Sequence, residues 1–163
     1  MGKVKYTFED FIKERGKDHE DFYRDLHACL TGEGYMAKVD QKKTGYFLSY
    51  IDKASKKTLL NVVSRKKGSF LRLYGDHSDQ YMDHMRGLRA SMVDDLKKGL
   101  ACKRMVDSSV CNPRCKMGIP IMIDDQIYNK CRNSAMFFFI EADKYEDLKD
   151  LISCEVQARS IEG

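Results

Sequence analysis

Hydrophobic residues near the start of the chain recur at helical intervals, in two groups: Phe8, Phe11 and Ile12, and then Phe22, Leu26 and Leu30. Thr7 and Asp10 have the spacing of a capping box, which starts a helix by satisfying its first free N–H groups. We therefore expect one helix before Gly16 and a second over residues 18–30, with Gly32 and Gly34 ending it.

The spacing changes in the next forty residues. Short runs rich in β-branched and aromatic residues alternate with polar, turn-forming segments, and the runs cover residues 35–39, 45–51, 58–64 and 69–74. Because the intervening turns are short, each strand is expected to pair with the next in the opposite direction. This region predicts a four-stranded antiparallel meander.

The second half returns to helical spacing and then to strands. We expect a helix over residues 78–100, interrupted near Gly87, then a hairpin of residues 119–123 and 127–130 turned by Asp124 and Asp125. A buried strand over residues 135–140 and a last helix capped by Asp143 and Glu146 follow. The predicted fold class is α+β: a four-stranded meander flanked by helices, with a second hairpin and a C-terminal strand and helix.

Length and composition favour one globular domain. The chain has 163 residues, 42% of them hydrophobic and 33% charged, with only two prolines and no linker-like stretch, so we expect a single domain over residues 1–163. The longest apolar run, residues 135–140, is too short to cross a bilayer, and no signal-peptide core follows the N-terminus. We expect no membrane association and a cytoplasmic location, where thiols stay reduced.

Positive charge is concentrated in the predicted meander. The net charge of the chain is +4, but residues 38–72 alone carry +8. In a meander the first and third turns lie at the same end of the sheet, roughly 10 Å apart. These two turns carry five cations that could form an anion-binding site: Lys42, Lys43, Arg65, Lys66 and Lys67. An anionic ligand or nucleic acid is the partner this cluster suggests, with Phe70 and Tyr74 placed to stack on bases; solvated turn lysines are the alternative.

Four cysteines fall within thirty residues with the spacing C-x8-C-x3-C-x15-C: Cys102, Cys111, Cys115 and Cys131. If residues 124 and 125 form a two-residue turn, Cys131 lies opposite Gly118, three residues beyond Cys115. Four thiolates in a tetrahedron are the ligands of structural zinc, so zinc is the predicted cofactor. Unlinked thiols, a disulfide or redox pair and an iron–sulfur cluster remain open. Cys29 and Cys154 lie on helical stripes and are expected in the core.

The cysteine segment also resembles a known group of proteins. The motif Cys111-Asn112-x-x-Cys115-x-Met117-Gly118, followed by Lys130-Cys131-Arg132, is similar to that of small bacterial proteins of uncharacterised function, over most of the chain. The resemblance implies a bacterial source but no particular chemistry, so it assigns no catalytic residue.

No catalytic residue can be named from the sequence. Asp76 and His77 follow the fourth strand, with His84 seven residues after His77, and a carboxylate beside an imidazole can support base catalysis. An ordinary strand-to-helix turn explains them equally well. The function expected from the sequence is a small binding module with a structural four-cysteine zinc site. The alternative is a small metalloenzyme or thiol redox protein that uses the same cysteines, with an open coordination position.

Overall fold

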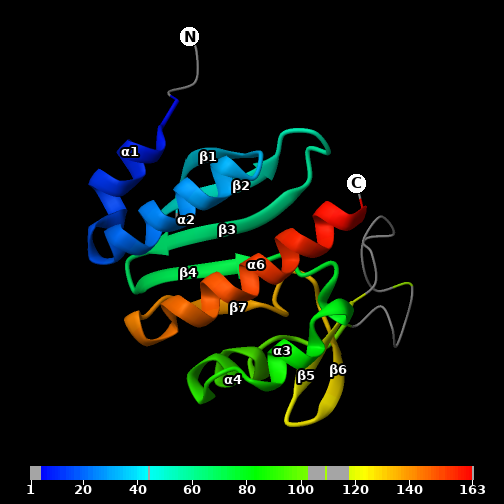
Figure 1. Ribbon diagram of the computed structural model, residues 1–163. Helices are drawn as coiled ribbons and strands as arrows, with labels where there is room; N and C mark the ends of the chain where they lie inside the picture. Colours follow the sequence, from blue (N-terminus) through cyan, green and yellow to red (C-terminus); the bar gives the residue numbers. More distant parts are fainter. Residues whose placement is uncertain (1–4, 44, 103–108, 110–117, 163) are drawn as a thin grey trace. The chain divides into compact units, whose positions relative to one another are not determined.

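The computed structural model describes residues 5–43, 45–102, 109 and 118–162 (Figure 1). The fold is α+β, as predicted, with strands β1 to β4 in an antiparallel meander, a second hairpin and helices near both ends. The chain divides into two compact units, residues 1–72 and 73–163. The single domain expected from the composition stays a prediction.

Helices of the first unit begin as the sequence predicts. The hydroxyl of Thr7 accepts the N–H of Asp10 at 3.1 Å, and the Asp10 carboxylate accepts the N–H of Thr7 at 2.7 Å, which confirms the capping box of α1, Phe8–Phe11. A π-helical turn, Ile12–Gly16, and a 3-10 turn, Lys17–His19, lead into α2, Glu20–Gly32. The interruption predicted at Gly16 is therefore a local change of helix type.

The meander consists of β1, Tyr35–Lys42, β2, Gly45–Asp52, β3, Thr58–Arg65, and β4, Gly68–Leu73. Lys42 pairs with Gly45, and Tyr46 pairs with Ser64, so the β1–β2 and β3–β4 turns lie at the same end of the sheet. This arrangement of the turns is the one expected from the sequence.

One face of the meander carries the core of the first unit. The cross-strand neighbours Val39, Leu48 and Val62 are buried, and α2 packs against β1. Six large side chains of the helical segment are buried as well: Phe11, Ile12, Phe22, Tyr23, Leu26 and Leu30. The two helical groups in the sequence therefore mark the residues that cover the sheet.

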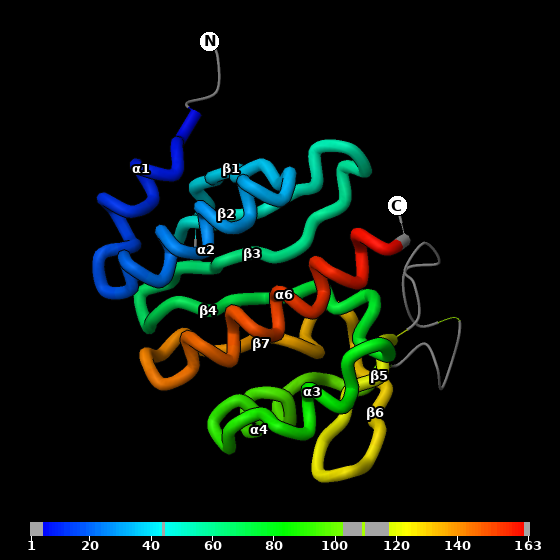
Figure 2. Tube along the Cα trace, viewed as in Figure 1, coloured from blue at the N-terminus to red at the C-terminus, as the bar shows by residue number. Residues whose placement is uncertain are grey.

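The second unit contains α3, Met82–Arg86, α4, Ala90–Lys97, the hairpin of β5, Ile119–Ile123, and β6, Gln126–Lys130, then β7, Phe137–Phe139, and α6, Tyr145–Glu162 (Figure 2). Helices α3 and α4 both pack against β5. The expected helix over residues 78–100 is divided into a 3-10 turn, Ser78–Gln80, and two short helices. The expected strand over residues 135–140 is reduced to β7.

The β5–β6 turn has the predicted position. Asp124 and Asp125 have φ angles of 48° and 64°, the left-handed conformation that two-residue hairpin turns require. Among the described residues, no helix has the length and apolar character needed to cross a membrane.

Candidate functional sites

The basic end of the first unit combines the β3–β4 turn with the segment that precedes α2. A pocket of about 260 Å³ lies between them, and five of the residues that line it are cations: Lys13, Arg15, Lys17, Arg65 and Lys66. Two carboxylates, Glu14 and Asp18, also line the pocket, so its formal charge is about +3. The hydroxyls of Ser64 and Ser69, 3.3 Å apart, belong to two further, buried lining residues.

Only two of the five predicted anion-binding residues line this pocket. Arg65 and Lys66 do, whereas Lys42, Lys43 and Lys67 are exposed at the same end of the sheet without lining it. The other wall, within residues 13–18, was not predicted from the sequence. The alternation K-E-R-G-K there was the available signal, but only the fold shows that it faces the β3–β4 turn.

Aromatic rings position the two arginines of the pocket. The Arg15 guanidinium lies 5.7 Å from the centre of the Tyr46 ring, and that of Arg65 lies 5.9 Å from the Phe70 ring. Within the described part of the chain, neither guanidinium forms an ion pair with a carboxylate. Their N–H groups are therefore suited to binding the oxygens of an external anion.

The predicted zinc ligands are only partly visible, because Cys111 and Cys115 lie outside the described residues. Cys102 is buried, Cys131 is half-buried, and neither forms a disulfide. No group of three or more metal-binding side chains occurs among the residues that the structure describes, which include two of the four predicted ligands.

Cys102 contacts Gly118, the residue just before β5, and Cys131 is the residue just after β6. The register pairs Ile119 with Lys130, which places Gly118 and Cys131 one step further along the ladder, as expected. The N–H of Gly118 donates to Sγ of Cys102 at 3.1 Å. A backbone N–H aimed at sulfur stabilises negative charge on it, and such bonds support metal-binding thiolates.

The two cations that flank Cys131 in the sequence have other partners. Nζ of Lys130 donates to the carbonyl oxygens of Lys97 and Gly99, at 3.3 and 2.8 Å, and burial lowers the pKa of this lysine. Arg132 donates to both carboxylate oxygens of Asp76, at 2.6 and 3.1 Å. These two charges are therefore committed to the fold.

The two remaining cysteines do not behave alike. Cys29 is exposed, so its expected place in the core is wrong: it stands one position before Leu30, outside the buried stripe of α2. Cys154 is half-buried, and burial raises the pKa of its thiol, with further contributions from Asp150 and Glu155. Neither cysteine lies in the predicted zinc set.

The carboxylate beside His77 is Glu155 of α6, whereas the sequence suggested Asp76. Nδ1 of His77 lies 2.8 Å from Oε2 of Glu155, and because an ionised carboxylate only accepts, the imidazole donates. Asp76 instead pairs with Arg132 and lies 3.5 Å from Arg159. The sequence could not indicate the pair of His77 and Glu155, because α6 is far from His77 along the chain.

Glu155 is completely buried, and each of its oxygens accepts two hydrogen bonds. Oε1 accepts the Tyr81 hydroxyl at 2.6 Å and the N–H of His77 at 3.1 Å; Oε2 accepts Nδ1 of His77 and Nε of Arg159, each at 2.8 Å. Burial, and then the charge of Glu155, raise the pKa of Tyr81. These hydrogen bonds hold residues 74–81 against α6. A structural role is therefore sufficient to explain the network.

Evidence of function comes from the geometry of the sites. Comparison with protein families, curated proteins and solved structures finds no match for this chain.

Proposed function

We propose that this chain is a small binding module whose basic pocket in the first unit takes a phosphate-bearing anion. The observation that carries the proposal is the pocket of about 260 Å³ lined by five cations from two separate segments. Its size suits a phosphate group or a short phosphate chain, and guanidinium groups bind phosphate through paired N–H donors. A nucleic-acid backbone or a small phosphorylated molecule would both supply this chemistry.

Two variants with equal loss of charge test the pocket. Arg65→Gln with Lys66→Gln removes two cations that line it, whereas Lys42→Gln with Lys43→Gln removes two exposed cations at the same end of the sheet. We expect the first variant to weaken binding of pyrophosphate or a short oligonucleotide about tenfold, and the second less than about threefold. Fluorescence titration of the oligonucleotide and calorimetry with pyrophosphate measure both affinities.

Salt dependence supplies the second criterion. Affinity for an oligonucleotide should fall as salt rises, and the pocket variant should have a shallower salt dependence because it makes fewer phosphate contacts. Absence of binding to both probes at low salt contradicts the proposal. Equal weakening by the two variants would show that only the general positive field matters.

The second unit, in this proposal, is held by zinc bound to Cys102, Cys111, Cys115 and Cys131. The N–H of Gly118 bonded to the Cys102 sulfur, and the position of Cys131 beside Gly118, support it. Such a site needs reduced thiols, which agrees with the cytoplasmic location we propose. Because four sulfurs close the coordination shell, the metal would stabilise the fold and take no part in a reaction.

Metal analysis of protein purified without chelator tests the zinc site. We expect about one zinc per chain, and a lower melting temperature after chelation, because metal binding contributes directly to folding. Cys102→Ser and Cys131→Ser should each reduce the zinc content, whereas Cys29→Ser, at an exposed position, should leave it unchanged. Metal-free protein that melts like the untreated protein would refute the site. Zinc retained by Cys111→Ser or Cys115→Ser would favour an open, three-sulfur site and the metalloenzyme alternative.

A further inference from the structure

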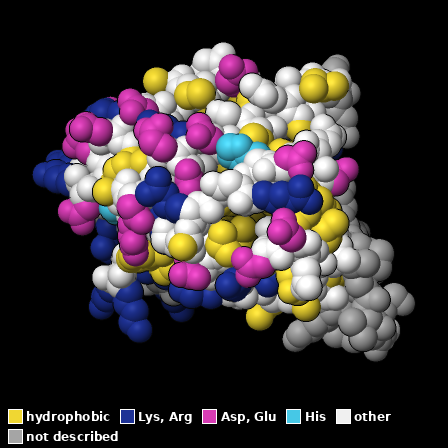
Figure 3. All heavy atoms as spheres, turned by 60° about the horizontal axis from the view of Figure 1, so that its bottom comes forward, with side chains coloured by type: hydrophobic (Ala, Val, Ile, Leu, Met, Phe, Trp, Pro, Cys, Tyr) yellow, Lys and Arg dark blue, Asp and Glu magenta, His cyan; other side chains and the backbone are white. Residues whose placement is uncertain are grey.

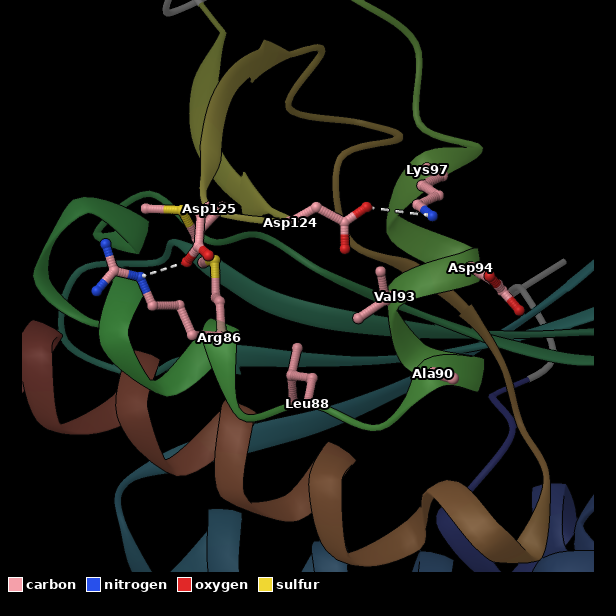
Figure 4. A pocket seen from close by; sticks show the side chains of 10 residues that line it. Arg86, Leu88, Ala90, Val93, Asp94, Lys97, Asp124 and Asp125 are labelled. Atoms are coloured by element: carbon pink, nitrogen blue, oxygen red, sulfur yellow. Dashed lines mark ion pairs between the residues drawn. The ribbon is translucent and has the colours of Figure 1, made fainter.

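A second pocket, of about 440 Å³, lies within the second unit between α3, α4 and the β5–β6 turn (Figure 4). Its volume falls in the range of small-molecule sites. Five apolar side chains from α3, the segment after it, α4 and β5 line it: Met85, Leu88, Ala90, Val93 and Met122. The two methionines are flexible and polarisable, so this lining can adapt to different apolar groups.

The rim of this pocket carries charges of both signs. Within α3, Nη1 of Arg86 donates to Oδ1 of Asp83 at 3.2 Å. Nε of Arg86 lies 3.5 Å from Oδ1 of Asp125, and Nζ of Lys97 lies 3.4 Å from Oδ2 of Asp124. Figure 4 shows both pairs joining the hairpin turn to the helices, one to α3 and the other to α4. Acidic and basic side chains also alternate with hydrophobic ones on the face in Figure 3.

These rim pairs are open to exchange with a ligand. The side chains of Arg86 and Asp125 are 52% and 84% exposed, and exposed ion pairs contribute little to stability. Both aspartates also occupy the left-handed region, with φ angles of 48° and 64°, where asparagine or glycine is the easier choice.

We propose that this pocket binds a small zwitterion with an apolar side chain, of the α-amino acid or dipeptide class. The ligand carboxylate takes the place of Asp125 beside Arg86, whose planar guanidinium matches a carboxylate with two N–H donors. The ligand ammonium then pairs with the released Asp125. Both charges of the ligand then have partners, the Lys97–Asp124 pair closes the other side, and the apolar side chain packs against the apolar lining of the pocket.

The charge balance explains why both ionic groups of the ligand matter. A ligand with only a carboxylate leaves Asp125 without its cation, and a ligand with only an amine competes with Arg86 for the same aspartate. A zwitterion does neither. This inference is independent of the anion pocket and of the zinc site, since it uses other residues and other ligand chemistry.

Titration of the full chain with three matched probes tests the proposal. L-Phenylalanine carries both charges, phenethylamine lacks the carboxylate, and 3-phenylpropionate lacks the amine. With the methionine methyl groups isotope-labelled, NMR reports directly on the pocket through Met85 and Met122, while Met36 of the first unit serves as an internal control. We expect saturable shifts of the two pocket methyl groups with phenylalanine, and affinities about fivefold weaker for each analogue.

Variants of the rim complete the test. Arg86→Gln and Asp125→Asn should each weaken phenylalanine binding about fivefold, whereas Lys98→Gln, just after α4 and outside the pocket lining, should not. Thermal melts confirm that each variant is folded. The proposal is overturned if the pocket methyl groups show no saturable shift up to about 10 mM ligand, if the three probes bind equally, or if the rim variants bind like the unchanged protein.

Discussion

Gly45 shows how one residue fixes the end of the meander that carries the basic pocket. It has a φ angle of 147°, and a Cβ atom built on it would overlap the carbonyl oxygen of Ser64, which lines the pocket. The β1–β2 turn therefore requires glycine here for conformation and for space.

Gly45→Ala should lower the free energy of unfolding by about 2–4 kcal/mol, because a backbone atom cannot move aside as a side chain can. The matched control is Gly32→Ala. Gly32 lies at the end of α2 with no neighbouring atom near a new Cβ, so alanine there should stabilise by about 0.5–1 kcal/mol. Urea unfolding of both variants measures the two effects; effects of the same sign would contradict this reading of the turn.

His27 makes the stability of the first unit depend on pH. Its ring stacks on Phe8 with centroids 3.9 Å apart, and its Nδ1 lies 2.9 Å from the Tyr50 hydroxyl. Burial lowers the pKa of His27; Glu9 raises it and Arg24 lowers it to smaller extents. His19 is also shifted downward by burial, against a smaller opposing effect of Asp18 on its pKa.

Because the folded pKa of His27 is below its unfolded value, the unfolded chain binds more protons in the interval between them. The contribution of His27 to the free energy of unfolding is therefore fully present above the ordinary histidine pKa. It is lost as the pH falls through the pKa of His27 in the folded protein. We expect urea unfolding to show lower stability at about pH 5.5 than at about pH 7.5, above the range where carboxylates titrate. His27→Gln should flatten this dependence, leaving the part due to His19. An unchanged slope in the variant would exclude His27 as its source.

At the scale of elements, the buried pair Asp95–Lys144 links α4 with the segment around β7. Nζ of Lys144 lies 2.8 Å from Oδ2 of Asp95 and also donates to the carbonyl oxygen of Phe139 at 3.0 Å. Both side chains are almost inaccessible, at 4% and 6% exposure. Removal of one partner would leave a charge in an apolar environment.

Lys144→Met should lower the free energy of unfolding by about 3–5 kcal/mol, and Asp95→Leu by a similar amount. The double variant should recover much of this loss, since no unpaired charge remains. Lys149→Met, which breaks the more exposed pair with Glu146, should change stability by less than about 0.5 kcal/mol. Denaturant unfolding of the unchanged protein, the two single variants and the double variant forms a double-mutant cycle; additive effects of the two buried changes would show that the pair is not coupled.

Strands and turns were predictable where the hydrophobic pattern and the turn residues indicated the same element. The composition of the sites was not predictable in this way. Alternation and turn residues defined all four strands of the meander and the hairpin around Asp124 and Asp125 to within a few residues. The break expected near Gly87 is present, but the helix over residues 78–100 was predicted too long, because it begins with a 3-10 turn, extended backbone at Arg89 precedes α4, and α4 ends at Lys97. The partner of His77 and the second wall of the basic pocket depend on segments distant in sequence, which no local spacing reveals.

At the scale of the whole molecule, the boundary between the two units has an unusual position. It falls between Arg72 and Leu73, inside β4, although domain boundaries usually fall in exposed, flexible linkers. Leu71 and Leu73, on either side of it, are completely buried. The boundary therefore lacks the exposed linker at which independent domains are usually joined.

We therefore expect the two units to unfold in one cooperative transition, in agreement with the single domain predicted for residues 1–163. Gly45→Ala in the first unit and Lys144→Met in the second should each reduce amide hydrogen-exchange protection in β3 and in α6 alike. Mass spectrometry of peptides from the two elements, along a denaturant series, measures this directly. If Gly45→Ala loosened β3 while α6 kept its full protection, the units would be independent domains joined through β4. Equal losses would mean that stabilisation of the second unit by zinc also protects the basic pocket of the first.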